Sequence, residues 1–451
     1  MQISNTQNAL VLLILTLLSK WRSFFTVSDR AFVSLLGALK VFLQVVGTLL
    51  HVDTIRHLAR HFPTSMYLFR KHLGFSKDDF IKYIVCPKCN SVYSLDEAVK
   101  TVNDVHGKTI RRLSNTCYHV AYPNHPQKKF RQKCGTVLMK SVVGKGGKEH
   151  LCPKKMYCYR SLVQSIKDLR MRPGFTEKCE KWRYRTVLEG TYADVYDGQV
   201  WKDFNTVSGQ PFLQIPGNLG LMLNVDWFQP YKNIQDSVGV IYLTVMNLPR
   251  EERCKYSNII VAGIIPGPNE PTHHINGFLE PLVADLQMLW DGVHCTDKDG
   301  RQHSIRAALM CISSDIPAAR KVAGFLGHFA TKGCSKCTKS FPRTEENKAD
   351  FSGFEDDWPL RNNTEHCQFA KRAKMAKNKA ERARIESMYG ARYSCLHDLP
   401  YLDVVRMHII DPMHNLLEGT AKRVMQAWKE LGVLSKDNFE VLQEKVNSLK
   451  L

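Results

Sequence analysis

The chain has 451 residues, a formal net charge of +20 and an apolar fraction of 44%. This length is typical of two or three domains with at least one buried core, which excludes a small disulfide-stabilised protein or a short peptide ligand. Because the charged fraction is an ordinary 24%, the positive charge reflects a shortage of acids and not a disordered basic tail. A folded protein that binds a polyanion is therefore favoured.

Residues 1–80 are predicted to be a helical region. Apolar residues recur at helical spacing between Leu35 and Val45, and Ser28 and Asp29 can cap a helix before them. The only membrane-like stretch that we identify, residues 9–18, has about ten residues, whereas a membrane-spanning helix needs roughly 18. No Lys or Arg precedes this stretch, so we expect neither a secretory signal nor a membrane anchor, and interpret it as a core helix.

Residues 81–160 carry the first candidate metal site. The tight C-x-x-C spacing of Cys86 and Cys89 can place two thiolates on one tetrahedral ion. With Cys117 and Cys134, this pair predicts a zinc-ribbon-like module. Two unrelated buried cysteines beside a single C-x-x-C pair are the alternative, and His119 and His125 are alternative ligands. The fourteen cysteines are spread over the whole chain, which favours a reducing compartment with metal thiolates.

Two segments concentrate the positive charge. Residues 100–160 contain fourteen Lys or Arg and two acids, with five Tyr or Phe residues interleaved. Residues 371–384 contain seven basic residues and one glutamate in a helical pattern. Such runs are usually solvated surface, but basic side chains around aromatic ones also suit the phosphate backbone of a nucleic acid. We expect double-stranded DNA as the partner.

Residues 161–210 are expected to connect this module to an α/β domain that occupies residues 211–451. Apolar runs there predict strands, and an amphipathic pattern after the third strand and another helical segment after the fourth predict helices. The strands are expected at 219–226, 238–246, 259–265 and 305–312, and the helices at 275–290 and 318–325. This order, strand, strand, strand, helix, strand, helix, is the ribonuclease H-like arrangement, a mixed sheet.

Two acids end two of the predicted strands. Asp226 ends the first strand and Asp315 ends the fourth, and in a ribonuclease H-like sheet these strands are neighbours. Converging carboxylates can hold two Mg²⁺ or Mn²⁺ ions about 3.5–4 Å apart, which activate the attacking oxygen and stabilise the leaving oxygen of a phosphodiester. From spacing alone, a turn at Asp226 and a helix cap at Asp315 are equally good interpretations.

A series of ordered motifs decides between these interpretations. They include GLMLNVDWFQP at 220–230, NLP at 247–249, IIPGP at 264–268, FLEPLV at 278–283, DIPA at 315–318, GCSKC at 333–337 and DPMHN at 411–415. Over residues 211–431 these motifs resemble the Tnp2 family of CACTA (En/Spm) DNA transposases. The resemblance implies a DDE-type catalytic core in which Asp226 is the first acid and Asp315 the second. Trp227 stands where a glycine is common in plant members.

The resemblance also implies a third acid, on a helix that follows an insertion at 338–407. Glu418 is closest to the family motif, and the alternatives are Glu430, Glu440 and Glu444. Because family catalytic regions continue past this point, we expect the domain to be incomplete at its C-terminal end.

A second C-x-x-C pair precedes the insertion. Cys334 and Cys337 need two more ligands to close a zinc site, and His408 and His414 are the nearest suitable pair if the insertion folds back. His328 and His397 are further candidates. Asp411 is interpreted as the N-cap of the helix that carries His414.

The sequence therefore predicts a DNA transposase-like protein that hydrolyses phosphodiesters and transfers strands at transposon ends, with Mg²⁺ or Mn²⁺ at the carboxylates and Zn²⁺ at the cysteines. It is expected to act in the nucleus on element ends and target DNA, without a membrane, and to form homo-oligomers. The alternative is a catalytically inactive, truncated or domesticated zinc-containing DNA-binding protein.

Overall fold

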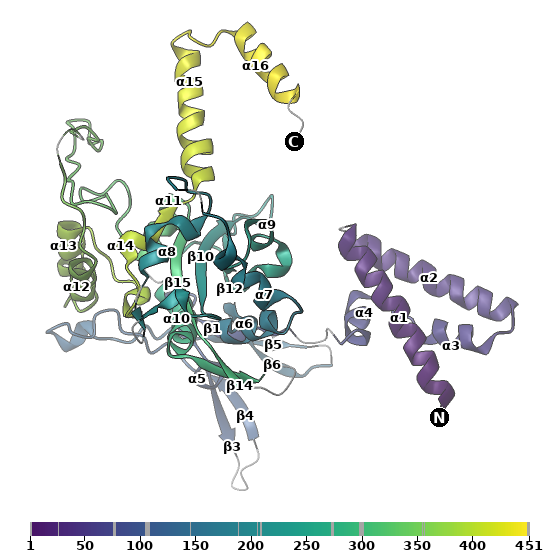
Figure 1. Cartoon of the computed structure of the whole chain (residues 1–451). Coiled ribbons are helices and arrows are strands. Elements are labelled where there is room, and N and C mark those ends of the chain that lie inside the picture. The colour runs from purple at the N-terminus through teal and green to yellow at the C-terminus, as the bar shows by residue number, and fades with distance from the viewer. Residues whose placement is uncertain are drawn as a thin grey trace. The chain divides into compact units, whose positions relative to one another are not determined.

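The computed structural model describes residues 2–448, except 26, 75–77, 104–108, 145, 188, 205, 208–209, 272–274, 297–301, 354 and 356. The chain divides into two compact units, Met1–Asp79 and Phe80–Leu451 (Figure 1). Each unit has an apolar core of its own.

The first unit consists of four helices, α1 (Gln2–Phe24), α2 (Asp29–Leu49), α3 (Asp53–His61) and α4 (Met66–His72). As predicted, Ser28 caps α2, because its hydroxyl accepts the backbone N–H of Ala31 at 3.3 Å. The core of the unit includes Leu15, Leu36 and the edge-to-face pair Phe32 and Phe69, with ring centroids 4.9 Å apart. Local caps and one apolar stripe per helix thus account for this unit.

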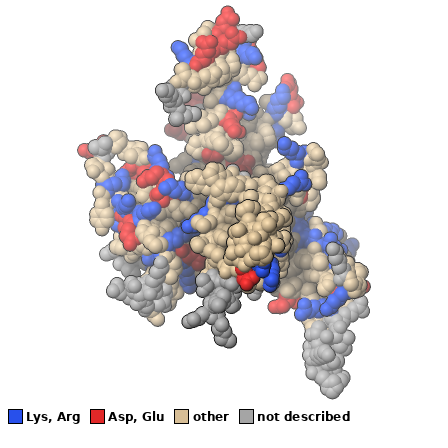
Figure 2. Space-filling view, turned by 90° about the vertical axis from the view of Figure 1, so that its right-hand side faces the viewer, with Lys and Arg blue, Asp and Glu red and all other residues tan. Residues whose placement is uncertain are grey.

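Helix α2 is the one described helix that is long and apolar enough to cross a membrane, by length and composition alone. The sequence analysis missed it, because it considered only residues 9–18. Helices α1 and α2 leave large apolar side chains exposed, among them Leu13, Phe24, Phe42 and Leu49. In the foreground of Figure 2 this unit presents a surface with few charged side chains. Core helices and signal sequences meet the same criterion, so the finding is weak evidence for a membrane.

The second unit is built on an eight-stranded sheet with the order β16-β15-β10-β11-β12-β7-β1-β2 (Figure 1). Its strands are β1 (Ile81–Val85), β2 (Val92–Tyr93), β7 (Met156–Tyr159), β10 (Leu219–Phe228), β11 (Val238–Val245), β12 (Ile260–Ile265), β15 (Ala307–Ser314) and β16 (His408–Ile410). Strand β10 is antiparallel to β11 and parallel to β15, and β16 is parallel to β15. The predicted mixed α/β sheet is confirmed.

Helix α10 (Asn276–Asp291) follows β12, and α11 (Ile316–Ala323) follows β15, so the predicted order of strands and helices is present. Phe278, Leu282 and Leu286 of α10 are fully buried and belong to the main core. A hairpin of β13 (Val293–Thr296) and β14 (Gln302–Ile305) lies between α10 and β15 in sequence. The sequence analysis did not predict this hairpin, because its strands are short and lack an apolar run.

Residues 161–210, which we expected to be a connector, contribute to the main core. They form α6 (Leu162–Arg170), α7 (Phe175–Glu180) and α8 (Gln199–Asp203), and Trp182, Tyr196 and Trp201 pack ring against ring. Asp285 of α10 accepts hydrogen bonds from the Ser161 hydroxyl at 2.9 Å and the Leu162 backbone N–H at 2.6 Å. Because β7 also pairs with β12, the basic module, this segment and the α/β region share one sheet and core.

The remaining elements surround this sheet. They are the hairpins β3 (Val99–Asn103) with β4 (Thr109–Ser114), β5 (Met139–Val143) with β6 (Glu149–Pro153) and β8 (Thr206–Val207) with β9 (Gln210–Pro211), and the short helices α5 (Leu95–Ala98) and α9 (Arg250–Arg253). The predicted insertion contains α12 (Asn363–Lys374), α13 (Lys379–Tyr389) and α14 (Val404–Met407). After β16 come the π-helical segment η7 (Met413–Ala421), α15 (Lys422–Glu430) and α16 (Lys436–Ser448).

Candidate functional site

Asp226 and Asp315 lie at the same edge of the sheet, on neighbouring parallel strands. Asp226 belongs to β10, and Asp315 directly follows β15. The two strands pair in parallel with Leu223 opposite Ile312. Continued by three residues, this register sets Asp226 opposite Asp315. The bond from the Val225 N–H to the Ser314 hydroxyl, at 3.0 Å, fastens the strands immediately before the two acids.

A third aspartate follows the next strand in the same way. Strand β16 pairs in parallel with β15 with Ile410 opposite Ser314, and the Asp411 N–H donates to the Ser314 carbonyl at 3.1 Å. Asp411 is therefore in register with Asp315. We call Asp226, Asp315 and Asp411 the carboxylate row. The sequence analysis gave Asp411 only a capping role, although the apolar strand residues Ile409 and Ile410 before an acid repeat the pattern that identified the other two.

His414 lies beside this row. Its Nδ1 atom is 2.7 Å from Asp411 Oδ2. This hydrogen bond raises the pKa of His414, and the charges of Asp315 and Asp226 raise it further. The negative charges of the three aspartates favour the protonated form of His414. When protonated, His414 offsets part of the repulsion within the carboxylate row.

The carboxylates retain oxygen atoms that could contact a cation. Asp226 Oδ1 accepts the N–H of Trp227 at 2.8 Å, and Asp315 Oδ1 accepts the N–H of Ala318 at 2.7 Å and caps α11. In the part of the chain that the structure describes, no hydrogen bond reaches the Oδ2 atom of either residue. Such hard oxygen ligands suit Mg²⁺ or Mn²⁺. The row is nevertheless open: among the described residues it is not a set whose ligand atoms all lie within 4.8 Å of one another.

Glu418, the residue proposed as the third acid, belongs to η7 and is exposed. Among the described residues it does not form a compact ligand set with Asp226 and Asp315. The three alternative glutamates, Glu430, Glu440 and Glu444, are also exposed. The role of Glu418 stays a prediction, and the structure draws attention to Asp411 instead.

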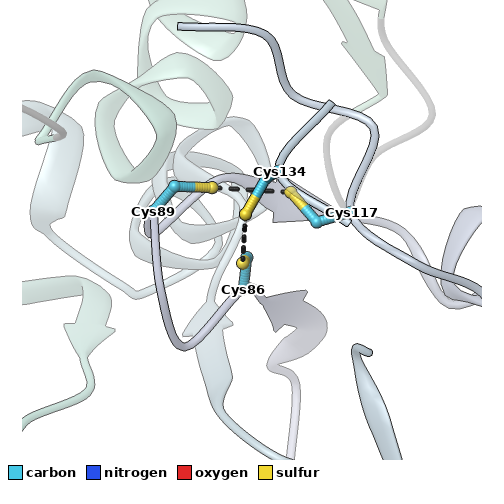
Figure 3. A group of neighbouring side chains, drawn as sticks. All are labelled: Cys86, Cys89, Cys117 and Cys134. Atoms are coloured by element: carbon cyan, nitrogen blue, oxygen red, sulfur yellow. Dashed lines mark hydrogen bonds between the residues drawn. The ribbon is translucent and has the colours of Figure 1, made fainter. Parts of the chain in front are cut away.

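The four cysteines of the first candidate site do come together (Figure 3). The Sγ atoms of Cys86 and Cys134 are 3.8 Å apart and those of Cys89 and Cys117 are 3.4 Å apart. All four ligand atoms lie within 4.8 Å of one another, so this four-cysteine cluster could hold a metal ion such as zinc. It is the only such group of three or more potential ligands among the described residues.

Two backbone turns build the four-cysteine cluster. In the first, the Asn90 N–H donates to the Cys86 carbonyl at 2.9 Å, and Asn90 has a left-handed φ of 56°. In the second, Gly135, with φ of 70°, donates its N–H to the Cys117 carbonyl at 2.9 Å. A glycine suits this conformation because it lacks a Cβ atom. The wide spacing of Cys117 and Cys134 is therefore bridged by a loop that returns beside its start.

Three hydroxyl groups contact three of the thiols. Ser91 Oγ is 3.2 Å from Cys89 Sγ, the Tyr93 hydroxyl is 3.0 Å from Cys117 Sγ, and Thr136 Oγ1 is 3.2 Å from Cys134 Sγ. Burial raises the pKa of the Cys134 thiol, but hydrogen bonds with Thr136, Cys86 and Cys117 together outweigh burial and lower the pKa to about 7. These groups were not predicted, although Ser91, Tyr93 and Thr136 each lie within four residues of a C-x-x-C cysteine or of Cys134.

The second proposed zinc site is not assembled in the same way. The N–H groups of Lys336 and Cys337 lie 3.4 and 3.3 Å from Cys334 Sγ, which forms a knuckle. His408 is fully buried with its ring 5.2 Å from that of Phe325, whereas His414 contacts Asp411. Among the described residues, Cys334, Cys337, His408 and His414 do not form a compact ligand set. This zinc site stays a prediction.

Comparison with known families agrees with this picture in part. Residues 189–385 match the family model described as Transposase family tnp2. The matched segment contains Asp226, Asp315 and the Cys334–Cys337 pair, but not the four-cysteine cluster or Asp411. No curated protein matches the chain. The family match supports a transposase family for the segment that carries β10 to β15 and most of the insertion helices.

Proposed function

We propose that the protein is a DNA transposase of the CACTA type, or a descendant of one, that cleaves and joins phosphodiesters through a DDE-type core. The observation that carries the proposal is the parallel register of β10, β15 and β16, which aligns the carboxylate row at one edge of the sheet. The family match over residues 189–385 supports the same reading.

The sheet topology supports a ribonuclease H-like fold for this core. Strands β10, β11 and β12 form an antiparallel meander, and β15 and β16 add in parallel on the other side of β10. Helices α10 and α11 follow β12 and β15. This strand order matches the one that the sequence predicted for a ribonuclease H-like sheet.

Asp226 and Asp315 are the residues that would hold Mg²⁺ or Mn²⁺, because both offer oxygen atoms at the carboxyl ends of adjacent parallel strands. Bound ions of this kind activate the attacking oxygen and stabilise the leaving oxygen of a phosphodiester, first with water and then with a 3′-hydroxyl as the nucleophile. Asp411 fixes the orientation of His414 through its 2.7 Å hydrogen bond and keeps a proton on that ring next to the reaction site.

The four-cysteine cluster would hold a structural zinc ion within a basic module that contacts DNA in the nucleus. Residues 100–160 supply Cys117 and Cys134 of this cluster and carry fourteen Lys or Arg against two acids. The side chains of the cluster are buried or half-buried, which suits a structural ion more than a catalytic one with an open position.

A metal-dependent nicking assay tests the proposal. Purified protein with Mg²⁺ or Mn²⁺ and duplex DNA is compared with Asp226→Asn and Asp315→Asn, and Glu251→Gln, an exposed acid on α9, is the control. We expect each aspartate variant to lower the cleavage rate by at least about 100-fold, since such charge stabilisation typically contributes that much. Cleavage that survives both changes would contradict the proposal.

The competing function is a non-catalytic zinc and DNA-binding protein. It is favoured by one observation: among the described residues only the four-cysteine cluster is a compact ligand set. This function predicts salt-dependent binding of duplex DNA without metal-dependent cleavage in the wild-type protein.

A further inference from the structure

A cleft of about 360 Å³ lies where the basic module meets α10 and the insertion helices α12 and α13. Its walls come from segments far apart in the sequence. The first is the loop between Cys89 and Tyr93, the second contains Tyr118, and the others include Lys374, Arg382 and Tyr393. All these residues belong to the second compact unit.

The cleft is the seam between the two basic segments that the sequence analysis identified. The Asn124 side-chain amide donates to the Met375 carbonyl at 3.2 Å, and the Arg382 guanidinium lies 4.7 Å from the centre of the Tyr122 ring. The two basic segments therefore contact each other here, through Tyr122 and Asn124 of the first and Met375 and Arg382 of the second. Each had been interpreted separately as solvated charge or as a contact for a phosphate backbone.

One tyrosine ring in the cleft, that of Tyr118, is placed for stacking. Tyr118 is 49% exposed, and its hydroxyl donates to Glu97 at 2.7 Å while its ring packs edge-on against Tyr93 at 4.8 Å. These contacts fix the ring and leave part of it open to the cleft. Tyr393 also lines the cleft, and the Lys374 ammonium lies over its ring, 3.8 Å from the centre.

The cleft is also lined by the guanidinium groups of Arg382 and Arg392. The Nε–H groups of Arg382 and Arg392 are buried, and in the described part of the chain neither has a hydrogen-bond partner. Arg392 forms an ion pair with Glu386, with 3.8 Å between Nε and Oε2. The other N–H groups of a guanidinium are well suited to donate to phosphate oxygens. Glu280 and Glu386 on the same walls can accept from the amino group of a base.

We propose that this cleft binds one unpaired nucleotide of a DNA strand, with the base stacked on Tyr118 and the phosphate at Arg382 and Lys374. Its volume lies at the lower end of the roughly 300–1,000 Å³ of small-ligand pockets, which suits one nucleotide and excludes a duplex. Base–aromatic stacking of this kind tolerates any sequence. The inference rests on the proposed function only in taking DNA as the polymer.

Binding of DNA to the full chain, measured by fluorescence anisotropy without divalent cations, separates this inference from cleavage. The probes are a labelled 12-nucleotide single strand of mixed sequence, the same strand as a duplex, and the same strand with abasic sites. The variants Arg382→Gln and Arg384→Gln remove the same charge from the same helix, but only Arg382 lines the cleft.

We expect Arg382→Gln to weaken binding of the single strand by at least tenfold and Arg384→Gln by less than threefold, with duplex binding changed equally little by both. We expect Tyr118→Ala to weaken binding of the single strand about tenfold, because one stacked base is lost, and we expect Tyr118→Phe to bind the strand as tightly as the wild type. Tyr118 is half-exposed at the surface, so this pair tests the cleft even if Arg382→Gln unfolds.

Three results would overturn the inference. If Arg382→Gln and Arg384→Gln weaken binding of the single strand equally, the effect of Arg382 comes from general surface charge and not from the cleft. If abasic strands bind as tightly as intact ones, the cleft does not bind a base. Displacement of the strand by micromolar deoxynucleoside monophosphate would assign the cleft to a free nucleotide. If cleavage fails while the expected losses occur, the inference stands and the proposed function falls.

Discussion

The four-cysteine cluster and the carboxylate row are both candidate metal sites, but their construction differs. The thiols lie on tight turns, within 4.8 Å of one another and beside three hydroxyl groups. Of the carboxylates, Asp226 lies near the end of β10, Asp315 and Asp411 directly follow β15 and β16, and Asp226 is exposed. Neutral thiols can pack together before a metal arrives, whereas like-charged carboxylates repel one another unless cations or a group such as His414 compensate. Local turns therefore bring the thiols of the four-cysteine cluster together, whereas the sheet places the carboxylates of the row in register without bringing their oxygen atoms into one compact set.

Removal of a zinc ligand is expected to have the largest effect. Cys86→Ser takes one thiolate from the four-cysteine cluster, and apparent zinc-binding free energies of structural sites are about 10–16 kcal/mol. We expect loss of about one zinc ion per chain and unfolding of the basic module, measured by metal analysis and thermal denaturation. Cys254→Ser, at an exposed cysteine outside the cluster, is the matched control. Unchanged zinc content in Cys86→Ser would break the comparison, because the cluster would then not be a metal site.

Asp315 separates the catalytic role of the carboxylate row from its structural role. Its Oδ1 caps α11 through the Ala318 N–H, and asparagine caps a helix as well as aspartate does, whereas alanine costs about 1 kcal/mol. We therefore expect Asp315→Asn and Asp315→Ala to lose cleavage by at least about 100-fold, while only Asp315→Ala lowers the free energy of unfolding. Urea denaturation and the nicking assay measure the two effects. If Asp315→Asn cleaves DNA at the wild-type rate, the role of Asp315 is only to cap α11.

The difference between the sites also explains what the sequence could predict. Apolar runs ending in Asp226 and Asp315 are local patterns, so both the strands and their acids could be located before the structure was known. Strand β16 has three residues and pairs with β15, from which residues 315–407 separate it in the sequence, so no local pattern fixes the register of Asp411. Likewise, C-x-x-C spacing identifies Cys86 and Cys89, but the approach of Cys117 to Cys134 depends on a returning loop.

The segment labelled a connector shows the same limit. Trp182 and Trp201 are isolated aromatic residues in a polar stretch, and only the tertiary structure shows that both are buried with Tyr196. Periodicity over a short window cannot reveal a core built from single aromatic residues on short helices. The predicted domain boundaries at residues 160 and 210 follow changes in composition. In the structure, a shared sheet and core join the basic module, residues 161–210 and the α/β region.

Acid should weaken the part of the fold that brings β16 to the carboxylate row. His366 is 3% exposed, packs 4.4 Å from the Phe325 ring, and has its pKa lowered to about 3 by burial and by neighbouring His397 and Arg361. The unfolded chain binds a proton below about pH 6.5 and the folded chain does not, so stability is full above that pH and falls below it. Between pH 7.5 and 5 we expect a loss of about 2 kcal/mol from this residue.

Urea denaturation at the two pH values measures this loss. His366→Phe keeps a ring against Phe325 and should flatten the pH dependence by that amount, whereas His150→Phe, at an exposed histidine of β6, should leave it unchanged. Because both variants retain the four-cysteine cluster, any acid release of zinc affects them equally and cancels in the comparison. Parallel pH profiles for wild type and His366→Phe would show that this histidine is not buried in its neutral form.

The smallest effect is expected from the hydroxyl groups around the thiols, and it defines how far local construction determines a metal site. The Tyr93 hydroxyl is 3.0 Å from Cys117 Sγ and the ring is 3% exposed, so Tyr93→Phe removes one hydrogen bond and little packing. Such outer groups typically change metal affinity by about 10–100-fold, and we expect the lower end, about 1.4 kcal/mol. Competition with a chromophoric chelator measures the zinc affinity. Tyr83→Phe, at a half-buried tyrosine of β1 outside the cluster, is the control.

If both variants bind zinc as tightly as wild type, the turns at Asn90 and Gly135 alone are sufficient to position the ligands, and the hydroxyl groups only satisfy buried sulfur. If Tyr93→Phe alone weakens binding, the cluster owes part of its affinity to residues that no cysteine spacing reveals.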